Sequence, residues 1–274
     1  MFEKIMENVL KQKPLIHCIT NVVTMNDCAN AILAVHGSPI MADEQEEVEE
    51  ITSLCQGLVI NIGTLNERTV QSMIKAGKKA NELGHPVILD PVGVGASRFR
   101  RETIFRLLKE VQFSVIRGNI SEMKAVYFGT GTTQGVDADV QDVVGEENIE
   151  ETIEFAKKLS QRTGAVIAIT GAIDIVANDK KAYVIKNGCL NMAKVTGTGC
   201  MLSAILGVYV AANQEHIFEA TGCATAIMGY SGELAQAKVY KQNAGTGSLR
   251  VYLIDSLSMM TPQILNGGMK IETR

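Results

Sequence analysis

Short apolar segments alternate with amphipathic segments along most of this 274-residue chain. Four segments are continuously apolar and end in glycine, asparagine or proline, at residues 58–63, 86–91, 113–119 and 165–171. Continuous apolar runs are typical of strands that are buried on both faces of a parallel sheet. Between them, helical spacing occurs at residues 65–83, 98–111, 121–128 and 148–163. The alternation predicts an α/β fold in three layers, with a mostly parallel central sheet and helices on both faces.

The first 14 residues and the part of the chain after residue 171 depart from this alternation. Residues 1–14 mix charges of both signs, as in an ordinary first helix, and lack the apolar centre of a secretory signal. Two β-type runs flank Asn178 and Asp179, which predicts a hairpin over residues 174–186 that closes the edge of the sheet. From residue 199 to about residue 260 the chain is mostly helical. Its apolar segment 201–212 is shorter than the roughly 20 residues of a bilayer span, so we expect a buried helix.

Composition narrows the class of protein. Hydrophobic residues make up 46% of the chain and charged residues 20%, as in a soluble globular protein, and no repeat or low-complexity linker divides it. We therefore expect one domain over residues 1–274. The six cysteines form no C-x-x-C pair, which argues against zinc, and the net charge of -4 argues against nucleic acid. We expect a cytoplasmic protein that binds a small molecule.

A glycine-rich turn leads into the apolar helix. It consists of Gly197, Thr198, Gly199 and Cys200. Glycines let backbone N–H groups converge, and the start of a helix adds unpaired donors and a partial positive charge. The turn predicts an anion hole with Cys200 at its end, while an ordinary helix N-cap remains the alternative. The helix N-terminus is also expected to lower the pKa of the Cys200 thiol.

Polar side chains follow the predicted strands, at the rim where ligands bind in such sheets. Asp90 ends the second strand, Arg117 and Glu122 follow the third, and Thr170 follows the fourth. Carboxylates are hard oxygen ligands that suit Mg²⁺, so Asp90 and Glu122 are candidate ligands of a magnesium nucleotide. Arg117 is a fork-shaped donor for phosphate. A surface Arg–Glu pair without a role is the alternative.

Two further residues near the N-terminus are candidates for a substrate pocket. Methionine adapts to flat apolar surfaces and asparagine both donates and accepts hydrogen bonds, so Met41 and Asn21 suit a small apolar ring with a polar handle. Core packing is the alternative for Met41. The chain has neither a P-loop motif nor the glycine fingerprint of a dinucleotide fold. A nucleotide would therefore need another kind of phosphate-binding site, and the turn at residues 197–200 is the candidate.

Six segments, in this order, resemble the hydroxyethylthiazole kinase family of the ribokinase-like superfamily. They are ITNVVTMN (19–26), GSPIMADEQEEV (37–48), LVINIGTL (58–65), ILDPVGVGAS (88–97), VIRGNISEM (115–123) and VTGTGCMLSA (195–204). The resemblance covers essentially the whole chain. One departure is Thr246, which stands in the stretch 243–248 where the family commonly has a proline.

The resemblance implies a kinase that uses Mg–ATP to phosphorylate the hydroxyl of 4-methyl-5-(2-hydroxyethyl)thiazole in thiamine salvage. It also implies a homotrimer with substrate sites between subunits. By position in the motifs, it implies substrate contacts for Met41, Gly197 and Asn21, ATP contacts for Arg117 and Thr170, and metal-side carboxylates for Asp90 and Glu122. Cys200 stands where related sugar kinases have a catalytic aspartate.

Two other functions stay open at this point. A kinase for another heteroaromatic alcohol, of the hydroxymethylpyrimidine or pyridoxal type, would keep the fold, but Cys200 argues against it. A nucleotide-binding sensor without catalysis is the second alternative. The presence of Asp90, Arg117, Glu122 and the glycine turn argues against a loss of catalysis.

Overall fold

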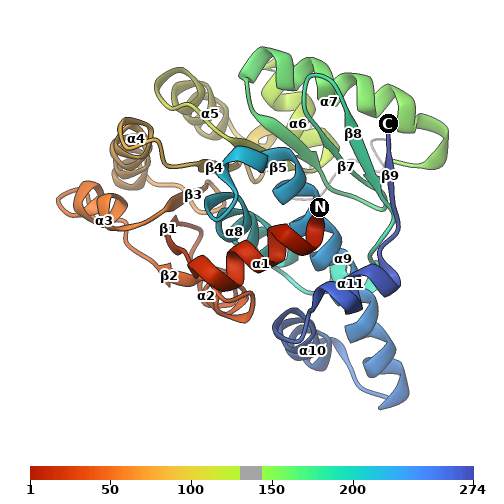
Figure 1. The fold of residues 1–274 in the computed structure, drawn as a ribbon. Coiled ribbons are helices and arrows are strands. Elements are labelled where there is room, and N and C mark those ends of the chain that lie inside the picture. Colours follow the sequence, from red (N-terminus) through yellow and green to blue (C-terminus); the bar gives the residue numbers. More distant parts are fainter. Residues whose placement is uncertain (130–143) are drawn as a thin grey trace.

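The computed structural model describes residues 1–129 and 144–274, and within them one sheet of nine strands runs through the fold (Figure 1). The order of the strands is β2-β1-β3-β4-β5-β6-β7-β8-β9. Their bounds are β1 (Leu15–Ile19), β2 (Ser38–Ile40), β3 (Gly57–Asn61), β4 (Val87–Asp90), β5 (Val115–Gly118), β6 (Val166–Ile169), β7 (Asp174–Ala177), β8 (Ala182–Ile185) and β9 (Ile271–Thr273).

The first six strands of the sheet are parallel, whereas β7, β8 and β9 are each antiparallel to the preceding neighbour. The four predicted strands are confirmed as β3 to β6, and the predicted hairpin is confirmed as β7 and β8. The prediction that this hairpin closes the sheet edge is wrong, because β9 pairs with β8 beyond it. Three residues next to the chain end carry too little alternation to be recognised as a strand.

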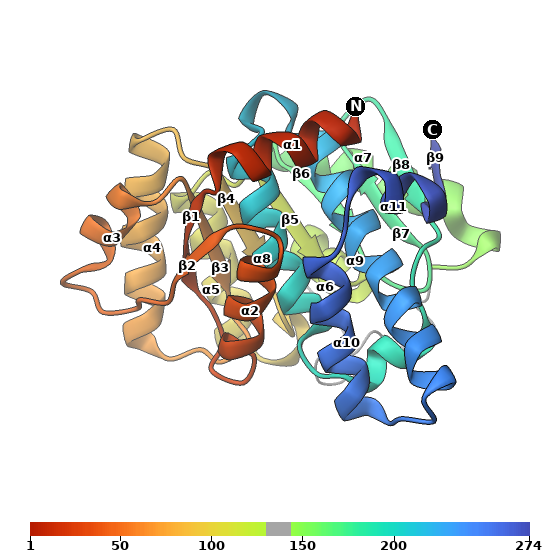
Figure 2. The same cartoon turned by 60° about the horizontal axis from the view of Figure 1, so that its bottom comes forward.

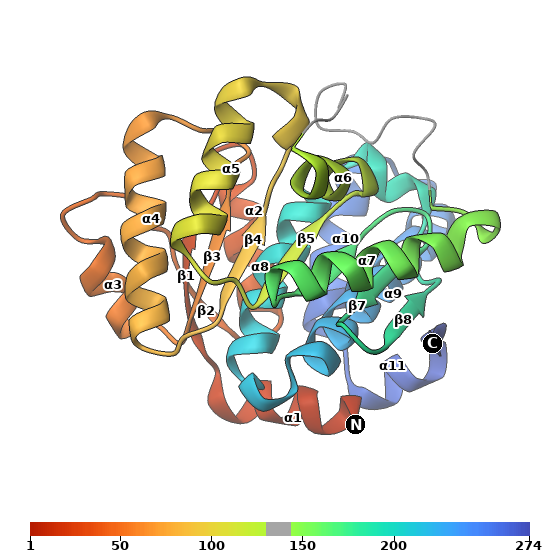
Figure 3. The ribbon, with the colours of Figure 1, turned by 90° about the horizontal axis from the view of Figure 1, so that it is seen from above.

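Helices cover both faces of the sheet (Figures 2 and 3). One face carries α1 (Phe2–Gln12), α2 (Met25–Ala34), α8 (Thr198–Ala211), α9 (Ile217–Lys241), α10 (Thr246–Ser258) and α11 (Pro262–Gly268). The other face carries α3 (Val48–Leu54), α4 (Glu67–Glu82), α5 (Arg98–Glu110), α6 (Ile120–Phe128) and α7 (Ile149–Thr163). Each face has its own apolar core, because neighbouring strand residues such as Leu58 and Val59 point to opposite sides. The three-layer α/β prediction is confirmed.

Helix α8 is the central helix of its face. Its residues from Met201 to Ala211 are all buried, which confirms the predicted core helix. The helix packs against β3, β4 and β1, and it begins at the same rim where these parallel strands end. None of the helices in the described parts of the chain is long and apolar enough to cross a membrane.

Candidate active site

The carboxyl ends of β3, β4, β5 and β6 meet at one rim of the sheet, because these four strands are parallel neighbours. The register pairs Asn61, the last residue of β3, with Asp90, the last residue of β4. Arg117 lies one residue before the end of β5, and Thr170 directly follows β6. Residues that are far apart in the sequence therefore share one rim.

Asp90 is the buried centre of this group, with no solvent exposure. Its Oδ2 accepts hydrogen bonds from Asn61 Nδ2 at 2.9 Å and from Ser203 Oγ at 2.7 Å. Arg117 Nη1 lies 3.6 Å from the same oxygen. Burial raises the pKa of the Asp90 carboxyl, although Arg117, Ser203 and Asn61 each act in the opposite direction. Among the described residues, Oδ1 has no hydrogen-bond partner.

The guanidinium of Arg117 connects β5 to its two neighbours on the rim. Nη2 donates to Thr170 Oγ1 at 2.6 Å, while Nη1 approaches Asp90. The guanidinium also lies against the first turn of α8, since a Cβ placed on Gly199 would come within 2.5 Å of Nη1. Within the described residues, the buried Nε has no acceptor. Arg117 therefore places a positive charge, with an unused donor, beside the start of α8.

Glu122 joins two loops of the rim through backbone hydrogen bonds. Its Oε1 accepts from the Gly93 N–H at 2.8 Å, and its Oε2 accepts from the Asn119 N–H at 2.8 Å. Asn119 is the N-cap of α6, and its side chain accepts from the Glu122 N–H in return. Burial and the charge of Asp90 raise the pKa of Glu122 to about 7. Two buried carboxylates thus repel each other across this rim.

Helix α8 begins at the predicted glycine turn. Gly197 is its N-cap and has φ +87°, a left-handed conformation that favours glycine. A Cβ at this position would also lie 2.6 Å from Thr24 Cγ2. Gly197 has no side chain with which to cap the helix, and the first turn of α8 contains no acidic residue. The N–H groups of the first turn have no partner within the helix, so they remain available to an anion.

Cys200 lies in the first turn of α8, between two buried carboxamides. Its Sγ accepts from Asn21 Nδ2 at 3.2 Å and from Asn61 Nδ2 at 3.3 Å. Burial and the charge of Asp90 raise the pKa of the Cys200 thiol. The prediction of a lowered pKa is wrong. It considered only the local helix, whereas burial and Asp90, which depend on the tertiary fold, raise the pKa of the thiol.

The structure brings most of the predicted site residues together. Asn21, Asp90, Arg117, Thr170 and Cys200 belong to one set of contacts.

Met41 stands apart from that set. It follows β2 at the edge of the sheet, is half-buried, and packs against the apolar core on the α8 face. The core packing that the sequence left open is therefore present for Met41.

A cavity of about 500 Å³ opens beside the start of α8. Arg117, Asn119, Thr170 and Thr198 line it, together with apolar side chains such as Leu202 and Met228. Its walls are thus partly charged and polar and partly apolar. This cavity combines a guanidinium, a hydroxyl and a helix N-terminus, which are the usual donors to a phosphate chain.

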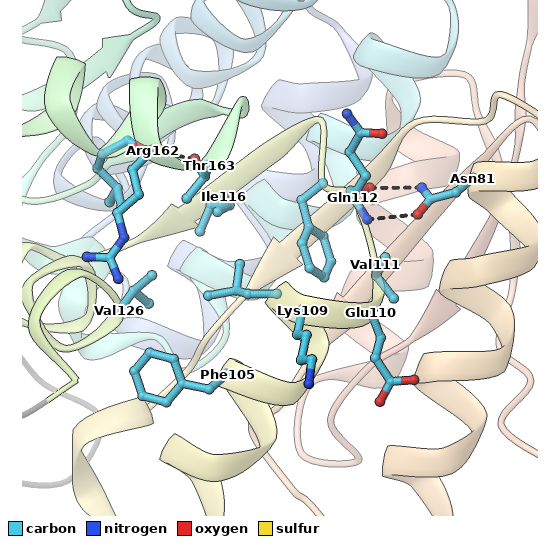
Figure 4. Close-up of a pocket in the computed structure, with 13 residues that line it drawn as sticks. Asn81, Phe105, Lys109, Glu110, Val111, Gln112, Ile116, Val126, Arg162 and Thr163 are labelled. Atoms are coloured by element: carbon cyan, nitrogen blue, oxygen red, sulfur yellow. Dashed lines mark hydrogen bonds between the residues drawn. The ribbon is translucent and has the colours of Figure 1, made fainter.

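A second cavity, of about 520 Å³, lies elsewhere (Figure 4). It is lined by Gln112 and Phe113, which precede β5, and by Thr163, which precedes β6, so it belongs to the amino-end rim of the sheet. The C-terminal ends of α5 and α7 face it, and helix C-termini carry partial negative charge. None of the predicted site residues lines this cavity.

Sequence reasoning missed three contributors to the site. Asn61 was recognisable as a strand-end polar residue, but its bridge to Asp90 and Cys200 was not. Ser203 lies four residues after Gly199, and this helical spacing is the signal that places it on the same face of α8. Thr24 precedes α2, and no sequence signal indicates its contact with Gly197.

Comparisons with known proteins extend over the whole chain. A model of the hydroxyethylthiazole kinase family matches residues 6–263. The hydroxyethylthiazole kinase of Clostridium acetobutylicum is 56% identical over 273 residues, which is 100% of both chains. The solved structure of hydroxyethylthiazole kinase from Pyrococcus horikoshii is 34% identical, with a TM-score of 0.88, and the match covers 100% of this chain and 98% of that chain.

More distant similarity concerns the fold alone. A ribokinase-like superfamily protein from Enterococcus faecalis has a TM-score of 0.59 at 12% identity, and the match covers 92% of this chain and 89% of that chain. The predicted ribokinase-like fold is therefore confirmed. The family match, the identity to whole relatives and the ordered motifs agree: the chain belongs to the hydroxyethylthiazole kinase family, whose members are phosphotransferases that act in thiamine salvage.

Proposed function

We propose that residues 1–274 form one kinase domain that transfers the γ-phosphoryl group of ATP to the hydroxyl of 4-methyl-5-(2-hydroxyethyl)thiazole. ATP as co-substrate follows from membership of a kinase family. The observation that carries the proposal is the position of Arg117, between Asp90 and Thr170 and against the open N-terminus of α8. Phosphoryl transfer depends mainly on positioning and on neutralising charge, and this arrangement supplies both.

The phosphate groups of ATP are proposed to lie in the cavity beside the start of α8. Arg117 and Thr170 bind the phosphate chain there, and both line this cavity. The N–H groups of the turn formed by Gly197, Thr198, Gly199 and Cys200 serve as the anion hole for the transferred group. Because the first turn of α8 contains no acidic residue, the positive end of the helix is not neutralised locally.

Mg²⁺ is proposed to bind on the side of Asp90 and Glu122. Oδ1 of Asp90, which has no hydrogen-bond partner among the described residues, is a hard oxygen ligand. Burial and, to a smaller extent, the charge of Asp90 raise the pKa of Glu122 to about 7, and a cation would relieve the repulsion between the two carboxylates. Among the described residues, no three His, Cys, Asp or Glu side chains form an all-protein metal site. Magnesium usually takes one or two carboxylates together with water and substrate phosphates, so the residues fit this ion. When bound, Mg²⁺ would neutralise phosphate charge.

The thiazole alcohol is proposed to bind next to Cys200. Asn21 and Cys200 are in contact, and Gly197 lies one helical turn earlier at the N-cap. Met41 supplies an adaptable apolar surface for the ring. Because the pKa of the Cys200 thiol is raised, we assign Cys200 a contact with the substrate hydroxyl rather than the role of a strong base.

We further propose a homotrimer in which a neighbouring subunit completes the substrate site. Helices α2 and α10 lie side by side (Figure 2). Apolar side chains are exposed next to Asn21 and on or directly after these two helices, where a partner would cover them. They are Val22, Val23, Leu33, Val251 and Met259, with exposed fractions from 50% to 72%. The cytoplasm is the proposed location, because ATP is available there and the six free cysteines stay reduced.

The test is a direct assay of phosphate transfer. Wild-type protein is incubated with ATP, Mg²⁺ and the thiazole alcohol, and thiazole phosphate is measured by mass spectrometry. Gly197→Asp is expected to abolish product, since it strains the left-handed N-cap and places a negative charge at the anion hole. Gly245→Asp is the matched control: Gly245 is the N-cap of α10, has φ -109°, and has open space around its Cβ position.

The outcomes separate the candidate functions. Thiazole phosphate from the wild type and from Gly245→Asp, but not from Gly197→Asp, supports both the substrate and the site. Product from hydroxymethylpyrimidine or pyridoxal in place of the thiazole would transfer the proposal to that alcohol. Binding of ATP without transfer to any of the three alcohols would indicate a sensor and contradict the proposed activity.

A further inference from the structure

The cavity beside α8 has both polar and apolar lining, and one carboxylate lies on its wall. Arg117 and Thr170 line the cavity, and so do Leu202 and Met228. Asp174, the first residue of β7, also lines this cavity. It follows Thr170 by four residues, and its hydrogen bond from the Gly171 N–H keeps it close to Thr170.

The side chain of Asp174 is half-buried and only partly satisfied. Its Oδ1 accepts from the Gly171 N–H at 2.9 Å, which holds the turn between β6 and β7. Among the residues that the structure describes, no donor reaches Oδ2. Burial raises the pKa of Asp174 to about 7, although Gly171 and Arg117 both act in the opposite direction. Oδ2 is not one of the buried unpaired atoms, so it keeps access to solvent and can accept from a ligand in the cavity.

We propose that Asp174 accepts hydrogen bonds from the ribose 2′- and 3′-hydroxyls of ATP; the assignment rests on the proposed function, in which this cavity holds the nucleotide. A carboxylate accepts hydrogen bonds and repels phosphate, so the phosphate chain is not its partner. Leu202 and Met228 offer apolar surface for the adenine ring. The ribose adjoins the phosphate chain, and its vicinal hydroxyls are donors that can reach a carboxylate close to Thr170.

Two nucleotides test this assignment in the wild-type protein. The affinities of ATP and of 2′,3′-dideoxy-ATP, which lacks both hydroxyls, are measured by titration calorimetry with Mg²⁺ present. Hydrogen bonds to a charged acceptor predict that ATP binds about ten- to a hundredfold more tightly. Because calorimetry needs no turnover, the result does not depend on whether the thiazole is the true substrate.

Asp174→Asn is the informative variant. The amide oxygen can keep the bond from the Gly171 N–H, while the amide nitrogen, which replaces Oδ2, cannot accept a hydrogen bond. The preference for ATP over the dideoxy nucleotide is expected to fall to about threefold or less. Asp179→Asn, in the exposed turn of the same hairpin, is the matched control and should keep the wild-type preference.

Each contrary outcome overturns the assignment. Equal binding of the two nucleotides by the wild type would exclude a ribose contact. An unchanged preference for ATP in Asp174→Asn would show that Asp174 only holds the turn between β6 and β7. Failure of ATP to bind at all would contradict the proposed function as well, whereas normal ATP binding with no thiazole phosphate would contradict only that function.

Discussion

Gly199→Ala tests whether catalysis depends on the position of the Arg117 guanidinium. The added Cβ would lie 2.5 Å from Nη1, 2.6 Å from Nη2 and 2.8 Å from Cζ. Ordinary contacts between heavy atoms are about 3.5 Å, so the guanidinium has to withdraw by about 1 Å. It then loses its 2.6 Å hydrogen bond to Thr170 and its place beside the first turn of α8.

The expected loss is kinetic rather than structural. A displacement of about 1 Å in a group that positions the substrate lowers kcat by about 100-fold. The clash involves the far end of a flexible side chain, and alanine favours a helix over glycine by up to about 1 kcal/mol. The free energy of unfolding should therefore change by no more than about 1 kcal/mol, because the helical gain offsets the weakened contact with Asp90.

Gly247→Ala is a closely matched control. Gly247 is the second residue of α10 and follows a threonine, as Gly199 does in α8, but nothing lies within 4 Å of its Cβ position. Steady-state assays give kcat for both variants, and urea unfolding gives their stability. A kcat for Gly199→Ala within about threefold of the wild type, or equal losses in both variants, would refute the reasoning about Arg117.

Three further predictions follow from the same contacts. Because the pKa of the Cys200 thiol is raised, iodoacetamide at pH 7 should alkylate Cys200 more slowly than it alkylates free N-acetylcysteine. Mass spectrometry of the peptides measures the rate. Faster alkylation of Cys200 would contradict the raised pKa. The pKa of Glu122 is about 7 in the folded state and about 4.3 in the unfolded state, so the folded state binds more protons between these pH values and the free energy of unfolding falls as pH rises through them. Glu122→Gln should make that decline shallower, as measured by urea unfolding at pH 5 and 7.5. An unchanged pH dependence would contradict the raised pKa of Glu122. Asn61→Ala should lower kcat at least about tenfold, because Asp90 and Cys200 both lose a hydrogen-bond donor. Asn213 is a buried asparagine near the other end of α8, and Asn213→Ala should lower the stability without lowering kcat. Equal kcat values for the two variants would show that Asn61 does not belong to the site.

The fold and the location of the site could be predicted from local patterns. Continuous apolar runs identify β3 to β6, and glycine or a polar residue marks the point where each run ends. Parallel strands place their ends at one rim, so Asp90, Arg117 and Thr170 could be grouped before any contact was known. The start of α8 at Gly197 was also predictable, because a glycine-rich turn precedes the apolar helical segment.

The contacts within the site were not predictable, because they depend on packing between distant elements. Ser203 reaches Asp90 across 113 positions of sequence only because α8 lies directly on β3 and β4. The pKa of Cys200 has the same origin: the local helix argues for a lower value, while burial and Asp90 raise it. Short edge strands escape detection as well, since β2 contains Pro39 and β9 has three residues.

The polar groups around Cys200 favour positioning over proton abstraction as the basis of the proposed reaction. Both carboxamides that donate to Sγ are themselves fixed: Asn21 Oδ1 accepts from the Thr24 N–H, and Asn61 Oδ1 accepts from the Gly63 N–H. A thiol with a raised pKa is a poor base at neutral pH. Phosphoryl transfer through a loose transition state does not need a strong base, but it does need fixed charges around the transferred group. Backbone-anchored side chains at the end of each strand supply that rigidity, so a cysteine can stand where a catalytic carboxylate would otherwise be expected.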